Sequence, residues 1–214
     1  MPFPIILSSP SGGGKTTIAH ELLALRNDVG YSVSCTTRPA REGEVNGRDY
    51  HFRSVADFRR GQDAGEFAES AEVHGHLYGT LRREVARVLA SGRHVIMDID
   101  VQGAQQFSAA FPESVLIFIL PPSPEALVDR LLARGTEDTI SLIRRFRSAK
   151  DELKAIDLYK YVVINDRVES AVASVSSIID AEGLKCSRSE GLDPLLRDLE
   201  DGIQRAIDLY STRK

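Results

Sequence analysis

The chain has 214 residues, of which 42% are hydrophobic and 27% are charged, and its formal net charge is −4. This composition is typical of a globular protein with one buried core and room for a small inserted lobe. A net negative charge argues against general nucleic-acid binding, which requires a basic surface. No apolar stretch reaches the ~18 residues of a membrane helix and signal-peptide features are missing, so we expect a cytoplasmic protein without a membrane partner.

The N-terminal segment is a predicted strand that runs into a glycine-rich turn. Its sequence is Ser8-Ser9-Pro10-Ser11-Gly12-Gly13-Gly14-Lys15-Thr16-Thr17. Such a loop points backbone N–H groups and a helix N-terminus at one phosphate group, while Lys15 can reach the outer phosphates and Thr16 can hold Mg²⁺. Ser9 stands where the P-loop pattern has glycine, and a surface turn that carries a lysine by chance is the alternative. We predict an ATP site formed by Ser11, Gly12, Gly13, Gly14, Lys15, Thr16 and Thr17.

Strands and helices alternate along most of the chain. Short β-branched apolar runs, typical of parallel strands buried on both faces, lie at residues 3–7, 94–97, 115–120 and 161–164. Apolar residues three or four positions apart predict helices at residues 18–25, 81–89, 101–111, 124–132, 140–153 and 168–181. The order predicts an α/β protein with a three-layer α/β/α P-loop NTPase core and a parallel sheet, built from residues 1–30 and 81–186.

Three segments lie outside this alternation. Residues 31–80 are rich in glycine and short aromatic runs, and predict an inserted mixed α+β lobe. Residues from about 133 to 147 contain a glycine break and several arginines, and predict a short helical lid. Residues 187–214 predict an amphipathic helical extension. We expect its apolar stripe to pack on the chain's own core, with a dimer contact as the alternative, so the sequence leaves monomer or homodimer undecided.

A set of motifs extends from the phosphate loop to about Cys186. They are Ser34-Cys35-Thr36-Thr37-Arg38-Pro39-Ala40-Arg41, Gly43-Glu44, Gly47, Asp49-Tyr50, Phe52, Glu69, Tyr78-Gly79-Thr80, Asp98-Ile99-Asp100-Val101-Gln102-Gly103-Ala104, Arg130, Arg134-Gly135, Arg145 and Ile164-Asn165-Asp166. Together they resemble the guanylate kinase family. The resemblance implies transfer of the γ-phosphoryl group of ATP to GMP or dGMP, with residues 31–80 as the GMP-binding lobe. It also implies ATP contacts by Arg130 and Asn165, and the departures from the family pattern are Ser9, Leu77 and Thr80.

The acceptor phosphate requires positive charge more than it requires a base. A phosphate monoester has a second pKa near 6, so it is already largely dianionic at neutral pH. Arg38 and Arg41 lie beside Ser34 in the sequence, and guanidinium forks bind phosphate oxygens in pairs. The phenols of Tyr50 and Tyr78 can each donate one more hydrogen bond. We predict that these residues bind the GMP phosphate.

Several cations are expected to surround the transferred phosphoryl group. Its loose transition state is stabilised mainly by positioned positive charge, which Lys15, Arg134 and Arg145 can supply, with Arg130 on the donor side. We therefore predict Lys15, Arg38, Arg134 and Arg145 as catalytic residues. The alternative is that the arginines between residues 130 and 147 belong only to the solvated faces of two helices.

Selection of guanine is predicted to rest on Glu69. Guanine presents N1–H and the exocyclic amino group as adjacent donors, and one carboxylate can accept from both. Ser34 and Thr80 can add hydroxyl contacts, and the family resemblance places Asp100 near the base. The alternative is that Glu69 is an exposed carboxylate on a strand.

Asp98 ends a predicted strand of the parallel sheet. A carboxylate at this edge can hold the water shell of Mg²⁺ opposite Thr16, so we predict Thr16 and Asp98 as metal-site residues. A helix N-cap is the alternative role, although Asp100 fits that role better.

Two other functions are compatible with parts of the sequence. One is a guanylate-kinase-like protein-binding module without turnover, although such modules typically lose the phosphate loop that is present in this chain. The other is a P-loop kinase with a different phosphorylated acceptor, in which Glu69 and Thr80 would have no evident role. We expect ATP as the phosphoryl donor, Mg²⁺ as the cofactor and GMP as the acceptor.

Overall fold

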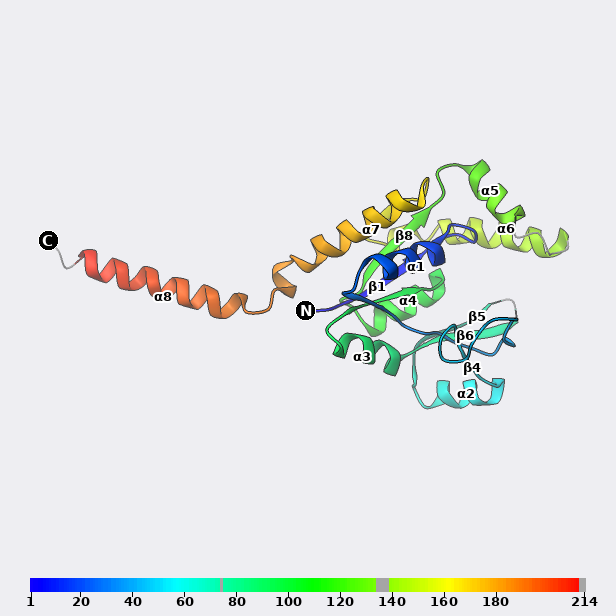
Figure 1. Ribbon diagram of the computed structural model, residues 1–214, viewed down its shortest axis with the longest axis horizontal. Helices are drawn as coiled ribbons and strands as arrows, with labels where there is room; N and C mark the ends of the chain where they lie inside the picture. Colours follow the sequence, from blue (N-terminus) through cyan, green and yellow to red (C-terminus); the bar gives the residue numbers. More distant parts are fainter. Residues whose placement is uncertain (74, 134–138, 212–214) are drawn as a thin grey trace. The chain divides into compact units, whose positions relative to one another are not determined.

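The computed structural model describes residues 1–73, 75–133 and 139–211 (Figure 1). By its internal contacts the chain divides into two compact units, residues 2–177 and Met1 with residues 178–214. The boundary falls inside helix α7 (Val168–Gly183). The second unit therefore begins ahead of residue 187, where the sequence predicts the extension to start.

The order of elements follows the predicted alternation. The strands are β1 (Pro4–Ser8), β2 (Val29–Tyr31), β3 (Cys35–Thr36), β4 (His51–Phe52), β5 (Phe67–Val73), β6 (His76–Leu81), β7 (His94–Asp98), β8 (Val115–Leu120) and β9 (Tyr161–Ile164). The other helices are α1 (Lys15–Leu25), α2 (Val55–Asp63), α3 (Arg82–Ala90), α4 (Val101–Ala110), α5 (Pro124–Leu132), α6 (Thr139–Leu153) and α8 (Leu192–Ser211), with short 3₁₀ turns at Ile156–Leu158 and Cys186–Arg188. Helix α6 thus continues past residue 147, the predicted end of the lid.

A five-stranded parallel sheet forms the centre of the first unit, with the order β2-β7-β1-β8-β9. Strand β1 lies in the middle, with Ile6 paired to Met97 on one side and to Leu116 on the other. Helices cover both faces, so the predicted α/β P-loop class is confirmed. The edge strand β2 is missing from the sequence prediction because it is only three residues long and contains Gly30.

The central strands β1, β7 and β8 are mainly apolar because both faces of the sheet are buried there. Ile6 packs in a core cluster with Val85 of α3 and Phe107 of α4. Its neighbours Ile5 and Leu7 are also completely buried, and successive side chains of a strand point to opposite faces. Helix α1 contacts β1, β2 and β7 and buries its own apolar side chains. The sheet therefore holds the loop between β1 and α1 on a packed three-layer core.

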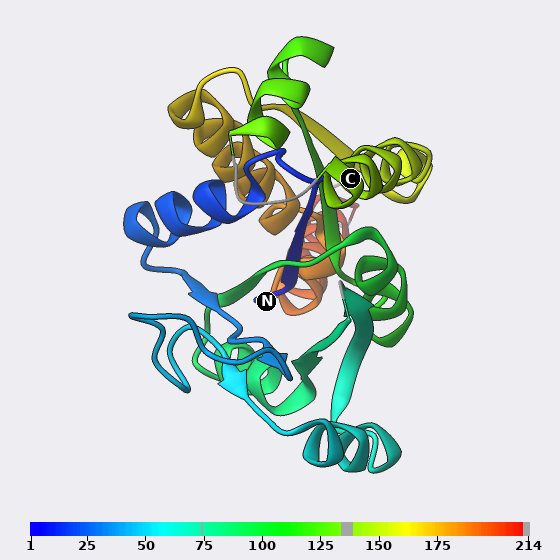
Figure 2. The same cartoon turned by 90° about the vertical axis from the view of Figure 1, so that its right-hand side faces the viewer.

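Residues 31–80 contribute a second, four-stranded sheet with the order β4-β3-β6-β5. Strand β6 is antiparallel to both β3 and β5. This sheet has its own small core of Cys35, Phe58, Phe67 and Leu81, in which the rings of Phe58 and Phe67 stack 4.4 Å apart. Helix α2 begins at Ser54, whose hydroxyl accepts from the Asp57 N–H. Figure 2 shows α2 and this sheet in cyan and blue-green beside the parallel sheet.

The second unit consists of the end of α7, a 3₁₀ turn and helix α8. Glu182 forms ion pairs with Lys185 and Arg188. None of the residues of α8 is buried, and most of its apolar side chains, including Leu199 and Ile203, are more than half exposed. The predicted amphipathic helix is present. Among the described residues, none of the helices is long and apolar enough to cross a membrane.

Candidate active site

The phosphate loop connects β1 to α1 as the sequence predicts. Gly12 and Gly14 have φ values of 86° and 91°, which glycine adopts without strain. Gly14 is the N-cap of α1 and provides no side-chain cap, so the first N–H groups of the helix stay available to an anion. The loop is closed by a 2.8 Å hydrogen bond from the Gly13 N–H to the Pro10 carbonyl. The chain thus presents a backbone cradle at the positive end of a helix.

Ser9, the departure from the P-loop pattern, is accommodated by Gly13. A Cβ atom at Gly13 would lie 2.5 Å from the Ser9 Cβ, a distance that real side chains do not tolerate. Ser9 is buried, and its hydroxyl donates to the Pro10 carbonyl at 3.0 Å. The serine therefore fits inside the loop because the residue opposite it has no side chain.

Two predicted ATP residues pack against the loop from the carboxyl end of the sheet. Asn165 is buried and donates from Nδ2 to the Gly13 carbonyl at 3.0 Å. Arg130 donates from Nη2 to the Asn165 carbonyl at 2.9 Å. The Arg130 Nη1 and Asn165 Oδ1 atoms are buried without a hydrogen-bond partner among the described residues. Such orphaned polar atoms are costly, and a polar ligand beside the loop would satisfy them.

Helix α6 holds the other side of the loop through two charged residues. Glu152 accepts from the Ser11 N–H at 2.9 Å, and its second oxygen accepts from the Ser148 hydroxyl at 3.1 Å. Arg145 is only 5% exposed, and its guanidinium donates to the Ser11 hydroxyl and to the Leu131 carbonyl, both at 3.4 Å. These contacts place a buried cation at the mouth of the phosphate loop.

A cavity of about 650 Å³ lies over the loop. Its walls are the loop itself, the start of α4, the end of β5 and one face of α6. Lys15, Thr16 and Thr17 line it together with Arg145 and Asp100. The volume is in the range of small-molecule sites, and the walls are largely polar.

Asp98 faces the start of α1 from the end of β7. One carboxylate oxygen accepts from the Thr16 hydroxyl at 2.5 Å and the other accepts from the Tyr31 hydroxyl at 2.6 Å. The predicted pair of metal-site residues is therefore adjacent. Burial, and then the charge of Asp98, raise the pKa of Tyr31 above its ordinary value, so this phenol stays a hydrogen-bond donor. The N-cap alternative belongs to Asp100, which caps α4 by accepting from the Gly103 N–H at 2.7 Å.

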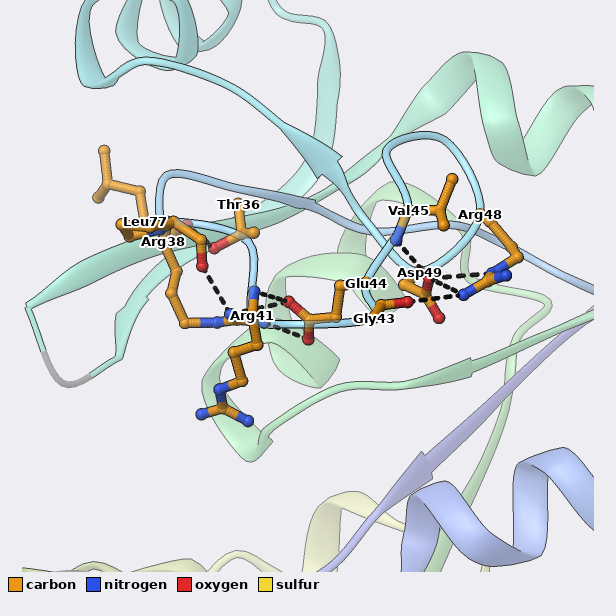
Figure 3. Close-up of polar contacts among 10 residues, drawn as sticks. Thr36, Arg38, Arg41, Gly43, Glu44, Val45, Arg48, Asp49 and Leu77 are labelled. Atoms are coloured by element: carbon orange, nitrogen blue, oxygen red, sulfur yellow. Dashed lines mark hydrogen bonds and ion pairs between the residues drawn. The ribbon is translucent and has the colours of Figure 1, made fainter.

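Three of the predicted phosphate ligands form a cluster on the second sheet. The Arg38 guanidinium lies 5.4 Å from the ring centre of Tyr50, and the rings of Tyr50 and Tyr78 are 6.1 Å apart. Burial raises the pKa of Tyr50. The Arg38 fork binds Glu44, whose carboxylate also accepts from the Arg41 N–H at 2.7 Å (Figure 3).

Glu69 is a buried carboxylate and only 6% exposed, so the alternative of an exposed strand residue is wrong. It pairs with Thr80 across β5 and β6, and the Thr80 hydroxyl donates to its Oε1 atom at 2.7 Å. Burial raises the pKa of Glu69 to about 7, although the Thr80 hydrogen bond opposes the shift; the charge of Asp100 adds to it.

Gly103 allows α4 to approach this carboxylate. A Cβ atom at Gly103 would lie 2.7 Å from the Glu69 Oε2 atom and 3.5 Å from Asp100 Oδ1. Helix α4 therefore packs its first turn directly on the predicted guanine site, and Glu69, Thr80 and Asp100 come together as the sequence predicts.

Ser34, Arg41 and Arg134 are the other residues that the sequence predicts for the site. Ser34 uses its carbonyl to accept from the His51 N–H at 2.8 Å. Arg41 is exposed, and its guanidinium extends away from Glu44 in Figure 3. Arg134 lies outside the described residues.

Sequence reasoning missed two carboxylates that contact predicted site residues. Glu44 binds Arg38; it was named only within a motif with Gly43, although its position three residues after Arg41 was a usable signal. Glu152 binds the phosphate loop, and its spacing from Arg145 and Ser148 places all three on one face of α6. Gly103 was named as part of a motif, but the sequence did not explain why glycine is needed there. Its close approach to Glu69 depends on the packing of α4.

The fold and the site define a P-loop phosphotransferase whose second sheet carries a buried carboxylate and a cluster of Arg38, Tyr50 and Tyr78. A model of the guanylate kinase family matches residues 1–182. A guanylate kinase of Caldanaerobacter subterraneus subsp. tengcongensis is 44% identical over 194 residues, which cover 91% of this chain and 94% of the relative. One of Clostridium tetani is 45% identical over 203 residues, covering 95% of this chain and 96% of the relative.

A solved structure agrees with these sequence matches. The guanylate kinase from Anaplasma phagocytophilum superposes with a TM-score of 0.76 at 35% identity, covering 92% of this chain and 94% of that one. The chain belongs to the guanylate kinase family.

Gly103→Ala should destabilise the protein by about 1–3 kcal/mol, because the new methyl group meets the buried Glu69 carboxylate. The matched control is Gly202→Ala in α8, where the added Cβ has only a distant contact and should stabilise the helix by up to about 1 kcal/mol. Urea unfolding of both variants measures the difference. Equal free energies of unfolding for the two variants would contradict the close packing of α4 on Glu69.

The buried Glu69 carboxyl should make the nucleotide-free protein less stable as the pH rises. Its pKa is raised from 4.5 to about 7, so between these pH values the folded state binds more protons than the unfolded state. Relative to Glu69→Gln, the wild type should lose about 3 kcal/mol of unfolding free energy between pH 4.5 and pH 8.

Urea titrations at both pH values test this expectation. Glu72→Gln, which removes an exposed carboxylate from the same strand, serves as the control. Parallel pH profiles for the wild type and Glu69→Gln would show that Glu69 has an ordinary pKa.

Proposed function

We propose a division of roles among the residues of this chain in the guanylate kinase reaction. The chain transfers the γ-phosphoryl group of ATP to GMP, giving ADP and GDP. The observation that carries the assignment of roles is the buried Glu69 carboxylate, which lies on one sheet while the phosphate loop lies on the other. A phosphate loop alone names only a nucleotide donor, whereas a buried carboxylate next to a hydroxyl specifies an acceptor with paired N–H donors.

The donor nucleotide binds at the phosphate loop. The backbone N–H groups from Gly14 to Thr17 hold its phosphates, and Lys15 reaches the outer ones. The residues from Ser11 to Gly13 shape the loop around the phosphates, since the Ser11 and Gly13 N–H groups bind within the protein. Arg130 and Asn165 contact the remainder of ATP, and this role is supported by their buried, unpaired polar atoms beside Gly13.

Mg²⁺ fits the residues at the start of α1. Thr16 and Asp98 supply a hydroxyl and a carboxylate that touch each other, and both are the oxygen ligands that Mg²⁺ prefers. Among the described residues, no group of three or more His, Cys, Asp or Glu side chains could hold a metal ion alone. Phosphate oxygens and water would therefore complete the coordination, and the bound ion would neutralise charge on the phosphates.

The acceptor binds on the second sheet. Glu69 accepts from guanine N1–H and the exocyclic amino group, while Thr80, Ser34 and Asp100 provide the other polar contacts to the base. Adenine would place an acceptor nitrogen against Glu69 and leave this buried carboxylate unpaired, which opposes AMP. The residues that bind the acceptor phosphate are Arg38, Arg41, Tyr50 and Tyr78.

Cations from both sides stabilise the transferred group. Lys15 comes from the loop, and Arg145 comes from α6, where its contact with Ser11 keeps it beside the loop. Arg134 is proposed as the third cation on the strength of the family motif. The intact loop and the buried Arg145 speak against a protein-binding module without turnover, because binding alone would need neither.

Lys15→Met should lower kcat by about 10³-fold, because one charge on the transferred phosphoryl group is lost. GMP binding should stay intact, since the acceptor site lies on the other sheet. Steady-state ADP release measures kcat, and calorimetry measures the Kd for GMP. Lys150→Met, which removes an exposed lysine of α6, is the control. An unchanged kcat in Lys15→Met would overturn its role, and lost GMP binding would contradict the two-site arrangement.

A further inference from the structure

In the described part of the chain, Glu44 is the one acidic side chain that hydrogen-bonds to the cluster of Arg38, Tyr50 and Tyr78, which is predicted to bind the GMP phosphate. Its Oε1 atom accepts from Arg38 Nη2 at 2.7 Å, and its Oε2 atom accepts from Arg38 Nη1 at 3.0 Å. The same Oε2 atom accepts from the Arg41 N–H at 2.7 Å. The Glu44 carboxylate therefore connects the Arg38 side chain to the Arg41 backbone (Figure 3).

The donor inventory of Arg38 shows which edge of the guanidinium Glu44 uses. A guanidinium has five N–H groups. Nη1 uses both of its hydrogens, one for Glu44 and one for the Pro39 carbonyl at 2.7 Å, and Nη2 uses one hydrogen for Glu44. Two N–H groups remain outside these contacts, one on Nε and one on Nη2. They lie on the other edge of the planar guanidinium, and such a pair of donors can bind two phosphate oxygens.

The ion pair is partly buried, which favours a fixed geometry. The side chains of Arg38 and Glu44 are 11% and 20% exposed. The pKa of Arg38 is raised, first by its hydrogen bonds to Glu44 and further by the Tyr78 hydroxyl. Tyr78, another predicted phosphate ligand, therefore lies against the same guanidinium.

The loop that carries Glu44 is itself held in a defined shape. Gly43 has a φ of 85°, and the Glu44 N–H donates to the Arg41 carbonyl at 3.1 Å, which closes a tight turn. Further along, Asp49 accepts from the Val45 N–H at 2.8 Å. A carboxylate thus fixes the backbone at each end of the loop, and Glu44 is the one that also contacts a phosphate-binding side chain.

We propose that Glu44 is a positioning residue of the acceptor site, which holds the end of the Arg38 guanidinium so that its other edge faces the GMP phosphate. It also fixes the Arg41 backbone, so that both arginines are ordered before GMP arrives. Glu44 acts through these arginines and does not contact GMP. The inference rests on the role proposed above for Arg38.

Loss of this anchor should weaken GMP binding specifically. Glu44→Ala should raise the KM for GMP about 10-fold, as expected for a lost charge-assisted hydrogen-bond pair, and Glu44→Gln should recover part of the loss because it keeps one oxygen acceptor. The kcat at saturating GMP and the KM for ATP should stay within about 3-fold of the wild type. The matched control is Glu42→Gln, which removes the same charge from an exposed position of the same loop and should leave all three constants unchanged.

A double-mutant cycle decides whether Glu44 acts through Arg38. In an Arg38→Ala background, Glu44→Gln should have no further effect on the KM for GMP, because the glutamine oxygen can still accept from the Arg41 N–H. Additive effects, or a KM that is unchanged or lower in both Glu44 variants, would overturn the inference. A lower KM in Glu44→Gln would instead identify Glu44 as an anion that competes with phosphate. If Arg38→Ala alone leaves the KM for GMP unchanged, the proposed role of Arg38 fails, and the role of Glu44 fails with it.

Discussion

The buried carboxylate of Glu69 is the constraint on which the rest of the site depends. A carboxylate that is almost completely buried is stable only when its oxygens are satisfied, and in the described part of the chain its hydrogen bonds come from Thr80. The same burial raises its pKa to about 7. A base with two adjacent N–H donors can bind the remaining hydrogen-bond acceptor sites of this carboxylate. In the proposed function, burial of this carboxylate lowers the stability of the protein without nucleotide, and the same burial favours guanine over a base that cannot donate to it.

In the proposed function the two sheets serve the two nucleotides, and α4 links the two sheets. Its N-cap Asp100 follows β7 of the parallel sheet, and its Gly103 packs against Glu69 of the second sheet. The same strand end carries Asp98, which contacts Thr16 of the phosphate loop. The stretch from the end of β7 to the first turn of α4 therefore contacts both the phosphate loop and Glu69. A carboxylate also holds each side in place, because Glu44 binds the Arg38 guanidinium and Glu152 accepts from the Ser11 N–H of the phosphate loop.

The sequence predicted the buried strands and the phosphate loop, because short stretches of neighbouring residues determine both. Parallel strands buried on both faces leave unbroken apolar runs such as residues 115–120, and the glycines before Lys15 mark a loop that needs positive φ values. Strand β2 left no such pattern because three residues with a glycine resemble a turn. Glu44 binds Arg38 and Arg41, which lie close to it in the chain. The contact of Glu152 with Ser11, in contrast, joins residues 141 positions apart, so this partner was not visible in the sequence. The burial of Glu69 likewise depends on α4, which begins more than 30 residues later in the chain.

The most direct test of this account is the titration of the Glu69 carboxyl itself. In protein labelled with ¹³C at glutamate side chains, with Glu69→Gln used for assignment, the carboxyl signal can be followed from pH 4 to pH 9 without nucleotide and with saturating GMP. We predict a pKa of about 7 for Glu69 in the free protein and a clear decrease when GMP binds, because the guanine N–H donors stabilise the charged form. A pKa near 4.5 in the free protein, or one that GMP leaves unchanged, would contradict the central role of this carboxylate.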